Sequence, residues 1–204
     1  MIRFASAVLV STTALYAADG APVLPQGQRD FAMSHMHATR KFFLDSVAGL
    51  SKEQWSFKAS PEKWSIAECA EHIATSEDYI WGLVEKLNAG PDASPEMIEK
   101  TKGKDQMIVE MVPKRDQKFQ APEPLKPKHM TENAADYIEK FRASRDRNIR
   151  SLDAAPASMR NKVTAHPALG PLDSYQWALL VSAHAERHTN QILEVKADPN
   201  FPKK

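Results

Sequence analysis

The chain has 204 residues, enough for one domain with a short appendage. Apolar residues make up 42% of it and charged residues 26%, which is typical of a globular protein. Lys and Arg total 27 against 26 for Asp and Glu, and this balance argues against nucleic-acid binding through a basic surface. The single cysteine, Cys69, excludes an intramolecular disulfide and any zinc site built on two cysteines.

The N-terminus has the layout of a secretory signal peptide. Arg3 precedes an uncharged, mostly apolar run that ends at Tyr16, and two alanines follow at the expected cleavage site. We predict a signal peptide over residues 1–18, a linker over residues 19–28, and a periplasmic or secreted protein. The alternative is a cytoplasmic protein with a frayed N-terminal extension. No later stretch reaches 18 consecutive apolar residues, so no stable membrane span is expected.

Residues 29–197 show apolar side chains at helical spacing in four separate segments. We therefore predict an all-α domain, a four-helix bundle, followed by a C-terminal tail at residues 198–204. The segments run from Phe31 to Leu50, from Ser65 to Asn88, from near Thr131 to Leu152, and from Asp173 to Val195. Ser65 with Glu68, and Asp173 with Gln176, have the spacing of capping boxes at the starts of the second and fourth helices.

The connection between the second and third helices is long. It runs from Gly90 to Met130 and contains six prolines, which favour an irregular crossover. Apolar side chains between Pro95 and Val112 predict one short helix within it. No segment shows the alternation typical of a strand, and residues 152–171 are predicted to form a loop.

Two of the seven histidines have the spacing of a metal-chelating pair. His184 and His188 are four residues apart, so on a helix their imidazoles lie on one face, one turn apart. At about 100° per residue, both point close to the direction of Trp177, which belongs to the apolar stripe. Both imidazoles therefore face the bundle interior. Ala185 occupies the position where an HExxH metalloprotease carries its general base, which excludes that class.

A third histidine, His72, lies on a second inward face of the second helix. Three inward histidines from two helices would form a site that leaves one coordination position open for water or substrate. Cys69 lies one turn away and is a further candidate ligand, although a small core residue is the simpler interpretation.

Three more side chains are candidates for supporting roles around this triad. Glu71 is adjacent to His72, and its carboxylate could hydrogen-bond a metal-binding histidine without itself binding the metal. Gln191 lies about one turn beyond His188 and could steady a ligand or simply pack within the bundle. His166 precedes the fourth helix and could line the mouth of the site or be fixed by its own loop.

These motifs together resemble the DinB-like (damage-inducible, YfiT-related) superfamily over residues 30–196. The resemblance implies a bundle of up-up-down-down type with a divalent metal, nickel or zinc, on a histidine triad. In this chain the triad would be His72, His184 and His188. The residues that carry the resemblance are Trp64–Glu68, Glu71–Ile73, His166–Leu172, Tyr175–Trp177, His184–His188 and Gln191–Ile192. The long connection and the signal peptide depart from the compact family pattern.

Three functions remain open at this stage. The first is a metal-dependent transferase or hydrolase for a small-molecule substrate, since the resemblance implies low-molecular-weight thiols as cosubstrates, and a divalent ion activates either a thiol or water. The second is a non-catalytic metal-binding bundle, and the third is a helical interaction module with hydrogen-bonded histidines. A homodimer is expected for a bundle of this size, and nucleic acid is not expected as a partner.

Overall fold

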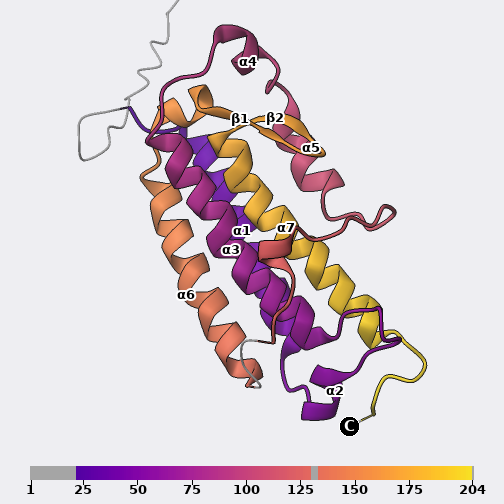
Figure 1. Cartoon of the computed structure of the whole chain (residues 1–204). Coiled ribbons are helices and arrows are strands. Elements are labelled where there is room, and N and C mark those ends of the chain that lie inside the picture. Colours follow the sequence, from indigo (N-terminus) through magenta and orange to yellow (C-terminus); the bar gives the residue numbers. More distant parts are fainter. Residues whose placement is uncertain (1–21, 130–132, 204) are drawn as a thin grey trace, which may run out of the picture.

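A computed structural model of the chain describes residues 22–129 and 133–203. The predicted signal peptide lies outside the described residues. Four long helices run along one another and confirm the predicted four-helix bundle (Figure 1). They are α1 (Gln26–Val47), α3 (Ile66–Asn88), α6 (Ala134–Asp153) and α7 (Ser174–Lys196). Helix α1 begins within the expected linker, so residues 26–28 belong to the bundle.

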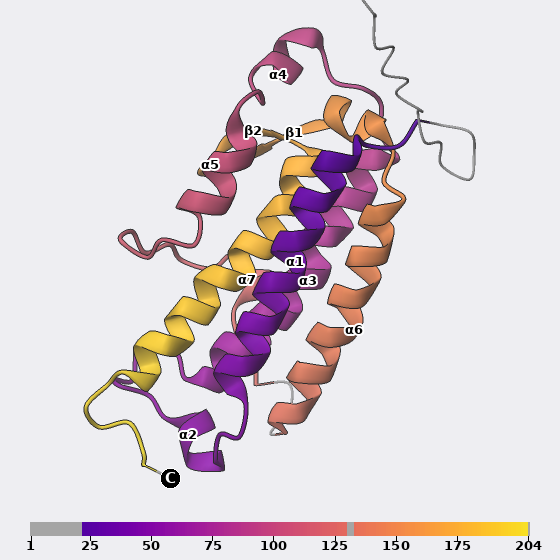
Figure 2. The ribbon, with the colours of Figure 1, turned by 180° about the vertical axis from the view of Figure 1, so that it is seen from behind.

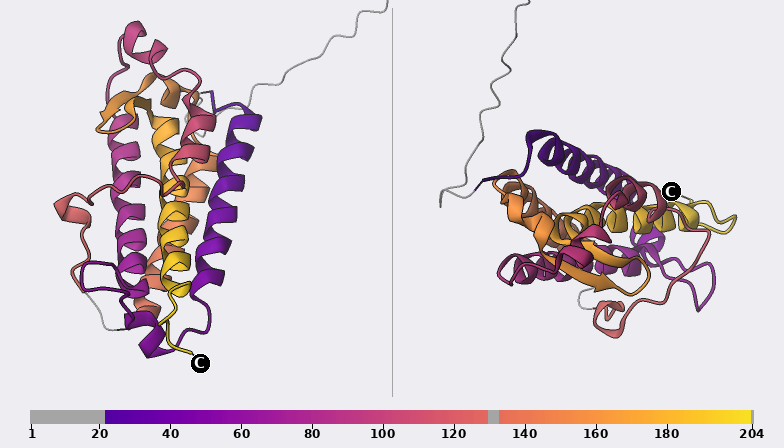
Figure 3. Two further views of the ribbon diagram at one scale, coloured as in Figure 1. Left: turned by 90° about the vertical axis from the view of Figure 1, so that its right-hand side faces the viewer. Right: turned by 90° about the horizontal axis from the view of Figure 1, so that it is seen from above.

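Each long helix packs mainly against two others. Helix α7 lies against α3 and α1, and α6 lies against the same two helices from the opposite side. Figure 2 shows α1 between α7 and α6, and the left view of Figure 3 shows the four long helices running side by side. The interface between α3 and α7 is therefore one complete side of the bundle.

Hydrogen bonds between helix ends fix the directions of the four helices. The Tyr175 hydroxyl donates to the Gln28 carbonyl, and Lys196 Nζ donates to the Ser46 carbonyl, so α1 and α7 run in the same direction. Ser174 Oγ at the start of α7 donates to Asn88 Oδ1 at the end of α3, so these two helices are antiparallel.

The order of directions corrects one expectation drawn from the resemblance. Helices α3 and α6 both run opposite to α1 and α7, so the chain goes down, up, up and down rather than up-up-down-down (Figure 1). An up-up-down-down bundle needs two long crossovers. Here the connection between α1 and α3 stays at one end of the bundle, where its short helix α2 (Lys52–Ser56) packs against α3.

Side-chain caps define the starts of the two helices that matter most for the site. The Ser65 hydroxyl accepts from Glu68 N–H, and the Glu68 carboxylate accepts from Ser65 N–H, which completes the predicted capping box of α3. Asp173 and Gln176 form the same reciprocal pair at the start of α7. Both predicted caps are confirmed.

A small hairpin replaces the loop predicted for residues 152–171. Strands β1 (Val163–His166) and β2 (Gly170–Asp173) pair antiparallel, with Val163 opposite Asp173 and His166 opposite Gly170. Four-residue strands are too short to show alternation, and the glycine and proline of β2 are residues that strands usually avoid. Gly170 has a φ of 70°, a conformation that glycine adopts without strain.

The long crossover contains two short helices where one was predicted. They are α4 (Pro95–Glu99) and α5 (Lys104–Met111), separated by Gly103 with a φ of 75°. Residues 112–129 then return along the bundle to the start of α6. We call this segment the crossover strap; it includes the 3-10 turn η1 (Glu123–Leu125), and a second turn, η2 (Ala157–Asn161), precedes the hairpin. None of the helices in the described part of the chain is long and apolar enough to cross a membrane.

A buried ion pair links α6 to α3 in the bundle interior. Arg145 Nε and Nη2 donate to the two Glu77 carboxylate oxygens at 2.6 and 2.8 Å, and Nη1 donates to the Met36 carbonyl and the Thr39 hydroxyl. The side chains of Arg145 and Glu77 are 0% and 1% exposed. Both charges are therefore fully desolvated and depend on each other.

Replacing Arg145 with methionine should lower the free energy of unfolding by about 3–5 kcal/mol, because it leaves the Glu77 carboxylate buried without its cation. Urea unfolding followed by circular dichroism measures the change. Arg147→Met is the matched control, since Arg147 pairs with Asp78 at the surface and its loss should cost less than about 1 kcal/mol. Equal effects of the two substitutions would contradict this assignment.

Candidate metal centre

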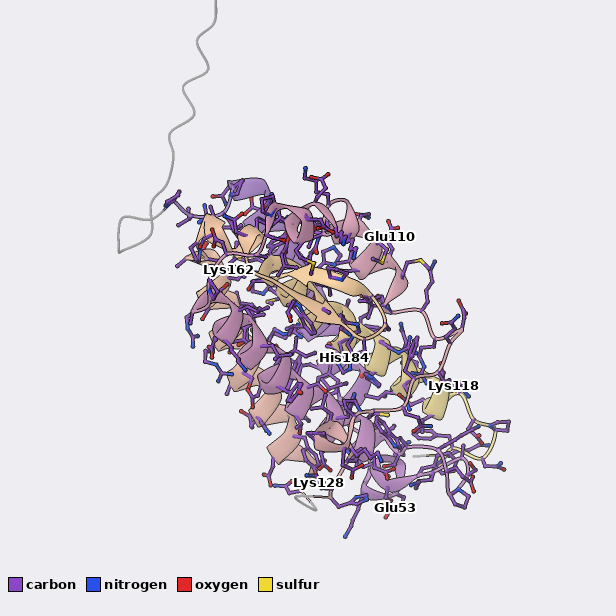
Figure 4. All side chains as sticks on the ribbon, turned by 45° about the horizontal axis from the view of Figure 1, so that its top comes forward. Glu53, Glu110, Lys118, Lys128, Lys162 and His184 are labelled. Carbon is purple, nitrogen blue, oxygen red and sulfur yellow. The ribbon has the colours of Figure 1, made fainter. Side chains whose placement is uncertain are left out.

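The three predicted histidines meet between α3 and α7. His72 Nε2 lies 3.2 Å from His184 Nε2 and 3.1 Å from His188 Nε2. Among the described residues they form the one group of three or more metal-ligating side chains whose ligand atoms lie within 4.8 Å of one another. His72 is buried, and the two histidines of α7 are nearly so. Figure 4 labels His184 midway along α7.

Helix geometry explains why these side chains converge. His184 and His188 are one turn apart on α7, so their rings lie side by side with centroids 4.5 Å apart. Helix α3 is antiparallel to α7 and carries His72 opposite the gap between them, 4.9 and 4.3 Å from the two rings. The Trp64 ring, just before the start of α3, covers His72 and His188 at 4.9 and 6.0 Å.

Hydrogen bonds at the outer nitrogens set the tautomers of two of the rings. His72 Nδ1 lies 2.7 Å from the Leu125 carbonyl oxygen, and His188 Nδ1 lies 2.9 Å from Gln191 Oε1. Both oxygens only accept, so in the neutral rings each Nδ1 carries the hydrogen. The Nε2 atoms of His72 and His188 then each carry a lone pair, and the two lone pairs face each other.

This donor set fits a divalent cation. Two lone pairs 3.1 Å apart repel unless an electropositive species lies between them. Two nitrogen ligands of a zinc ion, each bonded at about 2.0–2.1 Å, are about 3.3 Å apart in tetrahedral geometry. Carbonyl and amide oxygens that accept from Nδ1, as here, are the partners that orient metal-binding histidines. The cluster can therefore hold a metal ion.

Burial keeps the triad neutral, as metal ligation requires. It places the pKa of His184 and of His188 well below the ordinary value, and the neighbouring imidazoles add to the effect. The pKa of His72 is also lowered by burial, while its hydrogen bond to the Leu125 carbonyl opposes the shift. A proton is thus a poor substitute for a metal ion at this position.

Glu71 acts on the crossover strap rather than on a histidine. Its carboxylate oxygens accept from Lys128 N–H at 2.7 Å, His129 N–H at 2.9 Å and the Tyr137 hydroxyl at 3.0 Å. These bonds hold the strap just beyond Leu125, whose carbonyl orients His72. Glu71 therefore supports the site through the backbone.

The other candidates lie in two different environments. Gln191 contacts His188 directly, as described above. His166 Nδ1 accepts from Ala168 and Leu169 N–H of its own turn, and its ring packs against Trp177. These contacts agree with the interpretation that His166 is fixed by its own loop. Cys69 is fully buried in the apolar core, and burial raises the pKa of its thiol, which favours the core interpretation over a ligand.

Sequence reasoning missed the crossover strap as part of the site. Arg187 of α7 donates to the carbonyls of Val112, Lys114 and Gln117, and Asn190 donates to the carbonyl of Pro113. Irregular backbone of this kind leaves no periodic signal. The placement of Arg187 between the two histidines was the available clue, since a buried arginine needs acceptors.

The structure thus defines a class of protein: a four-helix bundle that carries a buried three-histidine cluster able to bind a metal ion. The chain belongs to the DinB superfamily, whose family model matches residues 35–192. It is also similar to YuaE of Bacillus subtilis strain 168, described as an uncharacterized protein, with 28% identity over 171 residues that cover 80% of this chain and 96% of YuaE. No solved structure matches the chain.

The buried histidines predict that the metal-free protein loses stability in mild acid. Because the folded-state pKa values of His184 and His188 lie below 6.5, the unfolded chain binds protons that the folded chain does not as the pH falls through that value. The free energy of unfolding should therefore decrease from pH 7 to pH 5.5, by at most about 1.4 kcal/mol per pH unit for each histidine.

Chemical unfolding in chelator across this range measures the slope. The double substitution His184→Gln and His188→Gln should reduce the slope, leaving the part due to His72. His37→Gln, at an exposed position of α1, should preserve the slope. An unchanged slope in the double variant would show that these rings are not kept neutral by folding.

Proposed function

We propose that this protein is a metal-dependent enzyme for a small-molecule substrate, with His72, His184 and His188 as the ligands of one zinc or nickel ion. The observation that carries the proposal is the convergence of three Nε2 atoms. In His72 and His188, the hydrogen bond at Nδ1 leaves Nε2 with a lone pair. Such an arrangement is costly without a cation and favourable with one.

The chemistry follows from the number of ligands. An ion held by three imidazoles keeps at least one coordination position for a substrate and lowers the pKa of a thiol or water that binds there. The described metal-ligating group contains no carboxylate or cysteine that would fill this position. This favours a reactive site, of S-transferase or hydrolase type, over a purely structural one.

A cavity that could take a small molecule shares one residue, Trp64, with the surroundings of the triad. This cavity of about 180 Å³ is lined by Trp64, Glu68 and Lys126, together with Gln120, Ala121 and Pro127 of the strap. The Trp64 ring lines this cavity and also packs against the rings of His72 and His188. Glu68 is engaged by its cap and by Lys58 at 3.1 Å. Lys126 Nζ pairs with Glu123 at 2.6 Å in an exposed ion pair that a polar group of a ligand could replace.

The cellular compartment decides whether a thiol or water would be the nucleophile. A cytoplasmic protein would meet low-molecular-weight thiols, whereas a protein exported by the predicted signal peptide would meet mainly water. Export to the periplasm or outside the cell therefore favours hydrolysis. N-terminal sequencing of the protein from its native host tests the export prediction, because cleavage would begin the mature chain near residue 18 or 19.

Purified protein should bind one equivalent of Zn²⁺ or Ni²⁺ per chain, and His72→Ala or His188→Ala should reduce the affinity at least about a hundredfold, because each removes one of three ligands. Elemental analysis of untagged protein and competition with a chromogenic chelator measure this. His166→Ala is the matched control, since its ring bonds its own turn. Wild-type protein that is folded yet binds neither ion would refute the metal site.

Activity is tested separately from binding. The loaded and chelator-treated wild type are compared in a screen of thiol and electrophile pairs and in a screen of ester and amide substrates. Turnover that requires the ion and is lost in His188→Ala supports the enzyme. Stoichiometric metal binding without turnover in either screen would instead favour a bundle that stores or senses the ion.

A further inference from the structure

A side chain of the crossover strap is linked to the histidine cluster through Gln191. Arg115 Nε and Nη2 donate to the two Glu194 carboxylate oxygens at 2.6 and 3.0 Å, and its remaining terminal nitrogen, Nη1, donates to Gln191 Oε1 at 3.2 Å. The Arg115 side chain is 13% exposed. The same Gln191 oxygen accepts from His188 Nδ1. A continuous path of hydrogen bonds thus joins Arg115 to His188.

The chemistry of the guanidinium fixes the orientation of the Gln191 amide. An arginine has five N–H donors and no acceptor, so only the oxygen end of the amide can face it. That oxygen then also faces His188, and because it can only accept, the hydrogen of the neutral ring must be on Nδ1. The ring nitrogen directed at the cluster, Nε2, is left with its lone pair.

Without Arg115 the opposite arrangement would be favoured. A glutamine amide can rotate by a half-turn at little cost, and its NH₂ group would then donate to His188 Nδ1. The ring hydrogen would move to Nε2, where it could donate to the His72 lone pair 3.1 Å away. This pairing removes the repulsion between two lone pairs in the metal-free protein, but it blocks His188 as a ligand.

We infer that Arg115 is a positioning residue that selects, through the orientation of the Gln191 amide, the tautomer of His188 that can bind a metal ion. The inference rests on the proposed metal site for its purpose, although the tautomer itself is a property of the metal-free chain. The bidentate pair with Glu194 fixes the plane of the guanidinium, which a lysine at this position could not reproduce.

The tautomer is measured directly by long-range ¹H–¹⁵N NMR of the metal-free protein. Wild type should show His188 protonated on Nδ1. Arg115→Met retains the aliphatic stem of the side chain and should shift His188 to the Nε2-protonated form, with a loss of zinc affinity of roughly tenfold, the lower end of the effect of second-shell losses.

A second substitution separates tautomer selection from simple anchoring of the strap. Gln191→Glu replaces the amide with a carboxylate that has no N–H, so in the double variant Arg115→Met/Gln191→Glu both side-chain oxygens can only accept. The double variant should regain the Nδ1-protonated His188, whereas a strap loosened by the loss of Arg115 would not be repaired by a change on α7. Rescue of the tautomer therefore supports the inference, and failure of the rescue overturns it.

Two matched controls complete the experiment. Lys118→Met removes one exposed positive charge from the same strap (Figure 4) and should leave both the tautomer and the zinc affinity unchanged. Glu194→Gln weakens the anchor of Arg115 but keeps its contact with Gln191, so it should preserve the tautomer. An Nδ1-protonated His188 in Arg115→Met would overturn the inference even if zinc binding fell.

The two proposals fail in different ways. If wild type binds no divalent ion but His188 changes tautomer in Arg115→Met, the proposed function is wrong and the role of Arg115 stands. If wild type binds zinc and Arg115→Met keeps both the tautomer and the affinity, the metal site stands and the role of Arg115 is refuted.

Discussion

The antiparallel contact between α3 and α7 places two imidazole lone pairs 3.1 Å apart in the interior of the bundle. Burial disfavours the proton that would otherwise relieve their repulsion, because it lowers the pKa of all three rings. The neutral state that results is the one that metal ligation needs. The close approach of the lone pairs, the low pKa values of the rings and a donor set that fits a cation are thus three consequences of one packing arrangement.

The crossover strap contacts the outer nitrogens of two of these rings, directly or through Gln191, and so helps to orient the rings. Its backbone supplies the Leu125 carbonyl to His72, its Arg115 reaches His188 through Gln191, and Arg187 of α7 fastens it by three carbonyls. A connection of this length adds little closure entropy relative to a shorter one. It can therefore serve the site at small cost to stability.

The sequence revealed what depends on periodicity and caps. The four long helices, the caps at Ser65 and Asp173, and the inward faces of the histidines on α7 all follow from spacing along one helix. The hairpin at 163–173, the second short helix after Gly103 and the down-up-up-down order could not be read in this way. Short strands carry too little pattern, and helix direction depends on which ends meet in space.

The same distinction explains which parts of the site were predictable. The histidines on α3 and α7 were found because a helix fixes their directions, whereas Leu125 acts through a backbone carbonyl that any residue type would supply. Arg115 is a different case, since its identity matters but its contact depends on the path of an irregular segment. Sequence reasoning therefore identifies the histidines that can bind a cation, and only the folded chain shows how their hydrogens are placed so that they can do so.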